Sequence, residues 1–328
     1  MRPPSNSLLV ADVHCILRWF REVCVFTRNI FLRLSDSRRM EAIVRRTPVS
    51  APLVRRFIAG EAMDDAEACV RELNAKGISA TLDYLGENVA NADEARESAE
   101  RCIEVIRLIA SRNLDANLSV KLTQIGLDLS TAMATENLRP ILEEAGSAGQ
   151  FVRIDMESSA HVDRTLEVFH ALWPEYKNVG LVFQSYLYRT DKDVEQAIRE
   201  GVRVRLVKGA YDEPPTVAYR NKSDVDASYC RLAQKLLKEG EYPAIATHDV
   251  KILNFVKDFC SRENIGPDRF EFQMLYGIRR DLQESLVREG YRMRVYTPFG
   301  TQWYGYTMRR LAERPANIWF VAKNLLRR

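Results

Sequence analysis

The feature that most constrains this chain is a regular alternation of short apolar segments with segments of helical periodicity, which runs from residue 64 onward. Eight apolar segments are predicted strands: 78–84, 118–125, 151–156, 180–185, 202–208, 243–247, 270–275 and 291–297. Helices are predicted between them over 91–112, 134–146, 161–172, 191–200, 219–239, 250–263 and 279–289, and a final helix over about 302–314. Because a crossover helix returns the chain to the same end of a sheet, such strands pair in parallel.

Eight strand–helix units over about 240 residues are typical of an α/β protein with a (βα)8 barrel. A doubly wound open sheet is the structural alternative. The sequence contains neither G-x-G-x-x-G nor G-x-x-x-x-G-K-[ST], the two phosphate-binding motifs of open sheets. We therefore expect a barrel over 61–328, preceded by a helical segment over 1–60.

Composition narrows the function classes. The net charge of +3 is too small to indicate nucleic-acid binding. Six scattered cysteines with no C-x-x-C pair, and four dispersed histidines, argue against a structural metal and favour a reducing, intracellular compartment. No apolar segment approaches the roughly 20 residues that span a bilayer, and there is no secretory signal.

Positive charge is concentrated at the start of the chain. Residues 1–56 contain 11 Arg, no Lys and 4 acidic residues, which gives 11 − 4 = +7. Apolar residues recur there at helical spacing, so we expect amphipathic helices packed on the main domain. A face that docks on a membrane surface or a partner, and a cleaved organellar presequence, are the alternatives.

Polar residues gather where the predicted strands end, which is where barrel enzymes place their active sites. They are Asp83, Glu87, Lys121, Gln124, Asp155, Glu157, Gln184, Arg205, Lys208, Thr247, His248, Asp249 and Gln273. Barrel interiors are normally filled with Val, Ile and Leu, so charges on this many strands are hard to explain as packing. Their convergence predicts a ligand site.

Two segments indicate what the ligand carries. Arg205 and Lys208 beside Gly209 suit a phosphate or a developing negative charge, and His248 is a candidate hydrogen-bonding group for a cofactor. On the final helix, Arg309 and Arg310 can grip one small anion from two sides. Glu313 follows at helical spacing and can orient either arginine. Planar guanidinium groups match a carboxylate.

Eight segments together form a recognisable pattern: LDYLGENV (82–89), SVKLTQIGLDL (119–129), RIDMES (153–158), FQSYLYRT (183–190), RLVKGAYDEP (205–214), ATHD (246–249), FQMLYGIR (272–279) and WYGYTMRRLAERPAN (303–317). From about residue 41 to the end, in this order, the chain closely resembles the bacterial monofunctional proline dehydrogenases. The resemblance implies a distorted (βα)8 barrel, non-covalent FAD, a final helix over the barrel mouth, and oxidation of L-proline to Δ1-pyrroline-5-carboxylate by hydride transfer from proline C5 to flavin N5.

The resemblance also assigns roles to individual residues. Lys121, Arg309 and Arg310 are expected to bind the proline carboxylate, Asp155 to hold Lys121, and Arg205 to lie near flavin N5. The expected FAD contacts are Met156, Gln184, Arg205, Lys208, Gly209, Ala210, Thr247 and His248. The expected substrate walls are Tyr211, Leu275 and Tyr296, and Glu87 is the expected gate residue that pairs with Arg309. Ser185 departs from the alanine usual in the family.

The same resemblance implies that electrons pass to a membrane quinone and that a separate pyrroline-5-carboxylate dehydrogenase takes the product. We expect a cytoplasmic protein, with peripheral contact to the inner face of the cytoplasmic membrane through the basic N-terminal segment as an open alternative. Two other functions are weighed: a hydroxyproline dehydrogenase, which Tyr296 would exclude by occupying the space of the extra hydroxyl, and a non-catalytic, flavin-free binding barrel.

Overall fold

The computed structural model describes residues 56–86 and 89–313, and for residues 309–313 the backbone alone. The described residues fall into two compact units, Ile58–Thr301 and the pair of segments 56–57 and 302–313. The predicted N-terminal helices lie outside the described residues, and the predicted domain boundary near residue 60 stays a prediction.

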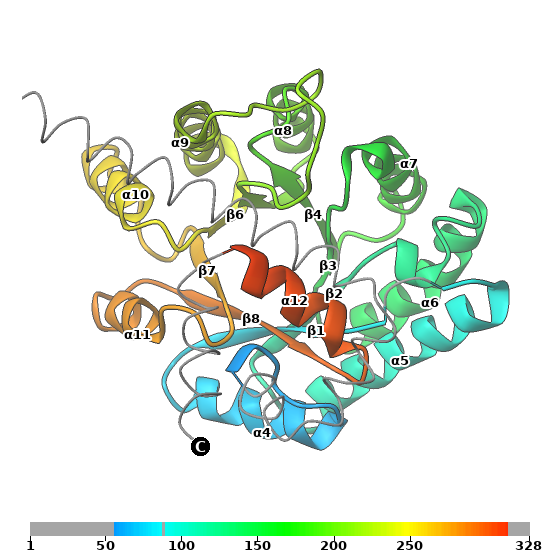
Figure 1. The fold of residues 1–328 in the computed structure, drawn as a ribbon. Coiled ribbons are helices and arrows are strands. Elements are labelled where there is room, and N and C mark those ends of the chain that lie inside the picture. The colour runs from blue at the N-terminus through cyan, green and yellow to red at the C-terminus, as the bar shows by residue number, and fades with distance from the viewer. Residues whose placement is uncertain (1–55, 87–88, 314–328) are drawn as a thin grey trace, which may run out of the picture. The chain divides into compact units, whose positions relative to one another are not determined.

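The larger unit is a closed barrel of eight parallel strands in the order β1-β2-β3-β4-β5-β6-β7-β8 (Figure 1). The strands are β1 (Ser79–Tyr84), β2 (Ala116–Val120), β3 (Val152–Ile154), β4 (Val179–Gln184), β5 (Arg203–Val207), β6 (Glu241–Ala246), β7 (Glu271–Leu275) and β8 (Met293–Phe299). Leu82 on β1 lies opposite Leu118 on β2 and Thr297 on β8, which closes the barrel. The predicted (βα)8 barrel is therefore confirmed, and the open sheet is wrong.

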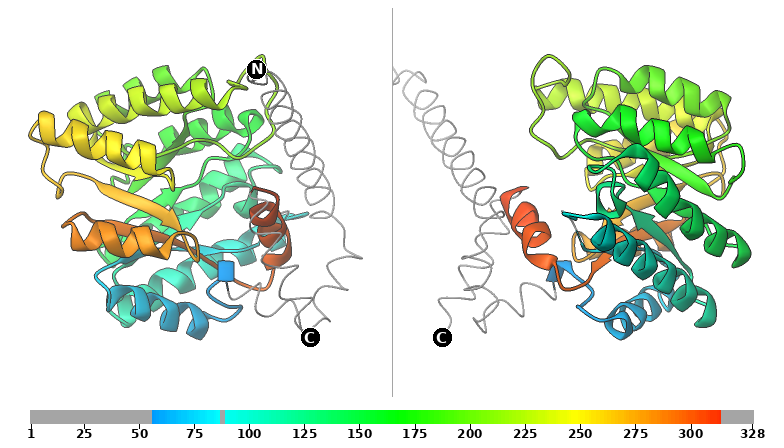
Figure 2. Two further views of the ribbon diagram at one scale, coloured as in Figure 1. Left: turned by 60° about the vertical axis from the view of Figure 1, so that its left-hand side comes forward. Right: turned by 90° about the vertical axis from the view of Figure 1, so that its right-hand side faces the viewer.

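Helices follow the strands along the chain. They are α4 (Met63–Asn74), α5 (Ala92–Ser111), α6 (Thr131–Ser147), α7 (Val162–Leu172), α8 (Thr190–Arg199), α9 (Lys222–Glu239), α10 (Val250–Arg262), α11 (Arg280–Arg288) and α12 (Trp303–Glu313), with 3-10 turns η1 (Thr123–Ile125) and η2 (Ser159–His161). Figure 2 shows the barrel helices on the outside of the strands. The final helix is present as predicted, and its expected place over the barrel mouth stays a prediction.

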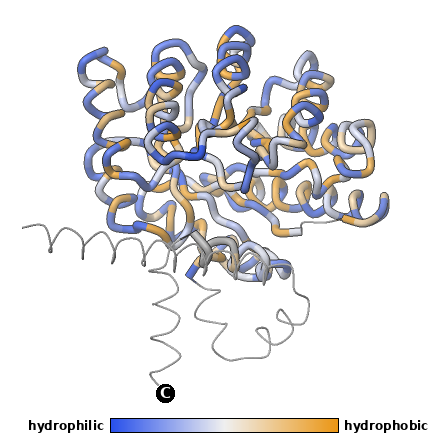
Figure 3. Tube along the Cα trace, turned by 45° about the horizontal axis from the view of Figure 1, so that its top comes forward, coloured by the Kyte–Doolittle hydropathy of each residue, from blue (hydrophilic) through white to orange (hydrophobic). Residues whose placement is uncertain are grey.

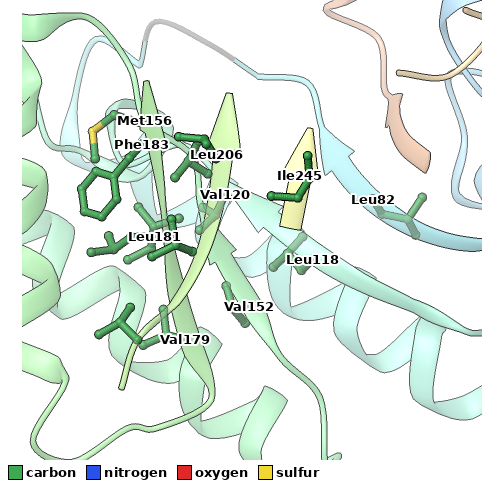
Figure 4. Close-up of a cluster of buried hydrophobic side chains, with 14 of the residues drawn as sticks. Leu82, Leu118, Val120, Val152, Met156, Val179, Leu181, Phe183, Leu206 and Ile245 are labelled. Carbon is green, nitrogen blue, oxygen red and sulfur yellow. The ribbon is translucent and has the colours of Figure 1, made fainter. Parts of the chain in front are cut away.

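The apolar core lies between the outer face of the barrel and the helices. Alternate strand residues point outward and are fully buried, among them Leu82, Leu118, Leu181 and Leu206 (Figure 4). In Figure 3 the barrel helices alternate along their length between hydrophobic and hydrophilic residues, as expected for helices with one buried face. Burial of each such leucine contributes about 1.5–3 kcal/mol, so this layer holds the scaffold that positions the site.

The barrel interior is polar, because the inward-facing residues carry hydrogen-bonding groups. Near the N-terminal ends of the strands, Arg294 Nε lies 2.9 Å from Glu271 Oε1, and Arg294 Nη1 donates to the carbonyl oxygen of Ala80 at 2.8 Å. The Gln273 amide donates to the same Glu271 oxygen. These contacts tie the Gln273 amide to the protein, and its predicted place in the ligand site stays a prediction.

The described residues contain neither a membrane-spanning helix nor a metal-binding cluster. None of the helices there is long and apolar enough to cross a membrane. Those residues also contain no group of three or more His, Cys, Asp or Glu side chains arranged to hold a metal ion.

Candidate active site

Asp155 is the centre of the hydrogen-bond network at the C-terminal end of the barrel. It follows directly after the last residue of β3, so its side chain lies at the edge where barrel enzymes act. Its Oδ1 accepts hydrogen bonds from Arg205 Nη1 at 2.8 Å and from Ser119 Oγ at 2.7 Å, and its Oδ2 accepts from the Tyr296 hydroxyl at 2.6 Å. Strands β2, β3, β5 and β8 therefore converge on one carboxylate.

Arg205 is the most informative cation of the site. Its side chain is almost fully buried, yet Nε and Nη2 have no hydrogen-bond partner among the described residues. Buried donors nearly always have a hydrogen-bond acceptor, and leaving a buried donor without one is costly. The Arg205 guanidinium carbon lies 5.3 Å from the centre of the Tyr296 ring. The arginine is thus fixed on one side, by Asp155 and Tyr296, and carries two donors for a ligand.

Lys121 forms its ion pair with a different acid from the one expected. Its Nζ lies 3.0 Å from Oδ1 and 2.9 Å from Oδ2 of Asp83, whose side chain is fully buried. The expectation that Asp155 holds Lys121 is wrong, because the Asp155 carboxylate is already taken by Arg205, Ser119 and Tyr296.

The charge of Asp155 affects the pKa of Asp83, and both carboxylates affect the pKa of Tyr296. Burial raises the pKa of Asp83, Lys121 opposes that rise, and the nearby charge of Asp155 adds to it. Burial beside Asp155 and Asp83 raises the pKa of Tyr296 well above its usual value, so the phenol stays protonated and remains a donor. Tyr296 therefore interacts electrostatically with both acids of the site, Asp83 and Asp155.

The residues expected to contact a cofactor lie at the ends of β4, β5 and β6 and just beyond β3. Lys208 Nζ contacts the carboxylates of Asp226 at 2.5 Å and Asp249 at 2.9 Å. Gly209 has φ of +116°, and a Cβ there would lie 2.3 Å from the Tyr186 ring. The glycine is thus required by the turn and by the close approach of that ring.

The other expected cofactor residues are already engaged with the protein. The Gln184 amide donates to the carbonyl oxygen of Glu157 at 2.8 Å, and the Thr247 hydroxyl accepts from Asp249 N at 3.1 Å. The His248 Nε2 accepts from the Leu275 backbone N–H at 3.0 Å, which places the proton of the neutral ring on Nδ1.

Two further expected cofactor residues differ in exposure. Met156 is buried in the apolar cluster of Figure 4, and Ala210 is exposed. No cofactor is part of the structure, so the contacts of both, like those of the residues above, stay predictions.

The expected substrate residues are only partly described. Tyr296 lies in the network, Leu275 is half-buried, and Tyr211 is 39% exposed. Glu87 lies outside the described residues, as do the side chains of Arg309, Arg310 and Glu313. Their roles stay predictions.

The sequence places Asp83 and Asp249 among the polar residues at the strand ends but gives neither an individual role, and it does not point to Ser119 or Asp226. Ser119 could have been found by strand alternation, because it lies two residues before Lys121 and thus faces inward with it. Asp226 lies on a helix and gave no such signal.

Comparisons with known proteins show the family of the chain. The family model described as proline dehydrogenase matches residues 66–323. "Proline dehydrogenase 2" of Bacillus subtilis is 43% identical over 304 residues, which cover 93% of this chain and 100% of the relative. "Proline dehydrogenase" of Deinococcus radiodurans is 41% identical over 305 residues, which cover 92% of this chain and 98% of the relative.

A solved structure supports the fold assignment. Proline utilization A (PutA) of Bdellovibrio bacteriovorus, inactivated by N-propargylglycine, superposes with a TM-score of 0.76 at 29% identity. The match covers 89% of this chain but 36% of that larger chain. The family match and the two full-length bacterial relatives show that this chain belongs to the proline dehydrogenase family.

Proposed function

We propose that this chain oxidises L-proline to Δ1-pyrroline-5-carboxylate with non-covalently bound FAD at the C-terminal end of the barrel. The observation that carries the proposal is Arg205, which is held by Asp155 and has two buried donors with no partner in the part of the chain that the structure describes. A flavin edge that gains negative charge on reduction is the kind of group such donors stabilise. Family membership supplies the reaction class.

The residues present fit a flavin nucleotide. Arg205 on β5 would face the flavin ring. Lys208 and the backbone at Gly209 follow the same strand, which is two strands round the barrel from β3. Ammonium groups and glycine turns suit the diphosphate of such a nucleotide. When bound, FAD would supply the acceptor for the hydride that leaves C5 of proline.

Substrate binding follows from the charges of the network. The Lys121 ammonium, held in place by Asp83, would bind the proline carboxylate, and Arg309 and Arg310 are proposed to share that role. Fixing the carboxylate places C5 through the rigid geometry of the five-membered ring. Tyr296, held by Asp155, would bound the ring and exclude a 4-hydroxyl group.

The state of the amine is set by the same cations. Only the neutral amine has a lone pair that can drive hydride departure, and nearby positive charge lowers the pKa of an ammonium group. Asp155 does not act as the base in this scheme, because three donors already occupy its carboxylate. The scheme needs no separate general base.

The visible spectrum of the purified protein, recorded anaerobically before and after addition of L-proline, tests the proposal. Flavin bands that bleach with L-proline are expected. Bleaching with 4-hydroxyproline alone would replace the proposal by a hydroxyproline dehydrogenase. A protein that takes up no flavin from added FAD would overturn it in favour of a binding barrel.

We also propose a membrane quinone as the electron acceptor and a cytoplasmic location with peripheral membrane contact. The basic segment 1–56 suits an anionic lipid surface, at about 1 kcal/mol per basic residue near the surface. Co-sedimentation of the full chain with vesicles that contain anionic lipid should weaken when Arg18, Arg21, Arg28 and Arg33 are changed to glutamine.

Reoxidation of the reduced flavin by a soluble quinone analogue tests the proposed electron acceptor. A separate pyrroline-5-carboxylate dehydrogenase is proposed to consume the product.

A further inference from the structure

Lys208 belongs to a group of four charges, and the proposed function gives a role to Lys208 but to none of the other three. Lys208 extends from the end of β5, Lys222 and Asp226 lie in the first turns of α9, and Asp249 precedes α10. Lys208 Nζ lies 2.5 Å from Asp226 Oδ1 and 2.9 Å from Asp249 Oδ2. Lys222 contacts the same two aspartates, at 3.2 Å for Asp249. Two positive and two negative charges therefore balance.

Asp249 makes more hydrogen bonds than Asp226, because it also contacts the backbone of α10 and the Thr247 hydroxyl. Its Oδ1 accepts a hydrogen bond from the backbone N–H of Lys251 at 3.1 Å, which caps the N-terminus of α10. Its own backbone N–H donates to the Thr247 hydroxyl at 3.1 Å. One residue thus fixes the ammonium of Lys208, the hydroxyl of Thr247 and the start of a helix.

We propose that Asp249 is a positioning residue for the cofactor diphosphate, which it serves by holding Lys208 in its binding geometry. This inference rests on the proposed function, because it requires that the chain binds FAD. An ammonium group has three N–H donors. Two of them meet Asp226 and Asp249 within the described part of the chain, and the side chain is 27% exposed, so the third can face a ligand.

Two explanations of how Lys208 binds phosphate predict different effects of removing the Asp249 charge. If Lys208 attracted phosphate only as a point charge, removal of a neighbouring negative charge would tighten binding. If Asp249 positions Lys208, its removal releases a long side chain whose rotamers must then be ordered by the ligand. Ordering one such side chain costs enough to weaken binding about three- to tenfold. The two explanations therefore predict opposite signs for one substitution.

Asp249→Asn separates the two explanations without removing the helix cap. Asparagine is as good an N-cap as aspartate, so the amide oxygen can retain the Lys251 contact. The amide nitrogen would then face Lys208 and cannot accept its hydrogen bond. Asp224→Asn is the matched control. Asp224 is exposed and lies in the first turn of α9, as Lys222 does, but it accepts hydrogen bonds from Asn221 and Ser223 and not from a lysine of this group.

Competition between FAD and riboflavin in the purified holoenzyme measures the effect. Riboflavin lacks the diphosphate and the adenosine of FAD, so the ratio of the two affinities reports contacts to that portion of the cofactor, the diphosphate included, and not general stability. The flavin retained after incubation with excess riboflavin is separated and quantified. We expect Asp249→Asn to lower the FAD-to-riboflavin affinity ratio about three- to tenfold, and Asp224→Asn to leave it unchanged.

A double-mutant cycle with Lys208→Met completes the test. If Asp249 acts through Lys208, Asp249→Asn has much less effect on the ratio when Lys208 is already methionine. A ratio that stays constant or rises in Asp249→Asn overturns the inference, as does a full effect in the Lys208→Met background. A wild-type protein that retains no FAD would instead contradict the proposed function, so the two failures are distinguishable.

Discussion

The Tyr296 hydroxyl donates a 2.6 Å hydrogen bond to Oδ2 of Asp155, the same carboxylate whose Oδ1 holds Arg205. The phenol that is proposed to border the substrate and the arginine that is proposed to face the cofactor are thereby linked through one acid. Because β8, β3 and β5 carry these residues, the link depends on closure of the barrel. A change at one of the three residues should therefore affect both halves of the site.

Tyr296→Phe and Tyr296→Ser should affect the enzyme differently. Both remove the hydrogen bond to the Asp155 carboxylate, which contributes about 1.5–3 kcal/mol, so kcat/KM for L-proline should fall at least tenfold in each. Only serine opens space beside the ring, so only Tyr296→Ser should raise kcat/KM for 4-hydroxyproline relative to L-proline. Steady-state kinetics with both substrates measure this, and an unchanged ratio in Tyr296→Ser would show that the phenol does not set specificity.

Arg205→Lys should slow flavin reduction while the fold persists. Lysine keeps a cation opposite Asp155 but lacks the planar arrangement of donors that leaves Nε and Nη2 available in Arg205. We expect the rate constant for flavin reduction by L-proline to fall about 10²–10³-fold. Anaerobic stopped-flow absorbance measures that rate constant.

The matched variant Arg205→Met leaves Asp155 without its cation and should destabilise the protein by about 3–5 kcal/mol. Thermal unfolding of the two variants separates the catalytic loss from the structural one. Equal flavin-reduction rates in wild type and Arg205→Lys would refute the role of the two free donors.

Asp83→Asn should raise KM for L-proline more than it lowers kcat. Lys121 would lose its ionic partner at 2.9 Å and would no longer be held toward the substrate carboxylate. A loss of about 1–3 kcal/mol, or roughly 5- to 150-fold in kcat/KM, is expected. Steady-state kinetics measure it, and a pure kcat effect would place Asp83 in the chemical step instead.

The stability of Asp83→Asn relative to wild type should change with pH in a defined direction. Because burial raises the pKa of Asp83 in the folded state, its contribution to stability is present below its ordinary pKa and is lost as pH rises through the raised value. Asparagine resembles the protonated acid at every pH. The difference in unfolding free energy should therefore shift in favour of Asp83→Asn as pH rises from about 4, measured by urea unfolding. A constant difference would show that the pKa of Asp83 is not raised.

The strand count of the barrel, and the edge at which its polar network lies, could be predicted from the sequence because buried strands have a simple apolar signature. The segment 118–125 shows the limit of that signature. The strand ends at Val120, and the chain turns into η1, in which Ile125 is still fully buried. Apolar content alone does not separate a buried strand from a buried turn.

The partner of Lys121 could not be predicted for a geometric reason. Lys121 follows β2, whose two neighbours in the sheet are β1 and β3, and each of them is associated with an aspartate at the same edge. Asp83 and Asp155 are therefore equivalent in the sequence pattern. Only the three-dimensional arrangement shows that Arg205 and Tyr296 occupy Asp155.

Acid unfolding should distinguish wild type from Asp249→Asn. Burial opposes ionisation of Asp249, but the hydrogen bonds and charges of Lys208 and Lys222 outweigh it and lower its pKa from 3.8 to about 2. Its contribution to stability is therefore present above pH 3.8 and is lost as pH falls toward 2. Urea unfolding at pH 5 and pH 3 should show a smaller decrease in stability for the variant, and equal decreases would contradict this ionic coupling.

Gly209→Ala should destabilise the protein more than a glycine replacement elsewhere. Gly209 has φ of +116°, which L-residues rarely adopt, and its new Cβ would lie 2.3 Å from Tyr186 Cδ1 and Cε1. The Tyr186 ring cannot retreat easily, because the side chain is buried and its backbone N–H donates to the Lys208 carbonyl oxygen at 3.0 Å. We expect a loss of about 2–4 kcal/mol in the free energy of unfolding, from strain and overpacking together.

Gly201→Ala provides the control that separates these two causes. Gly201 has φ of +68°, and nothing lies within 4 Å of the position of a Cβ there, so that variant bears the backbone strain alone. Its loss should be about 1–2 kcal/mol. In a Gly209→Ala protein, the further change Tyr186→Leu should recover part of the overpacking term by removing the ring. Urea unfolding of the four proteins measures both effects, and equal stabilities of the two alanine variants would show that the Tyr186 ring does not confine the turn at Gly209.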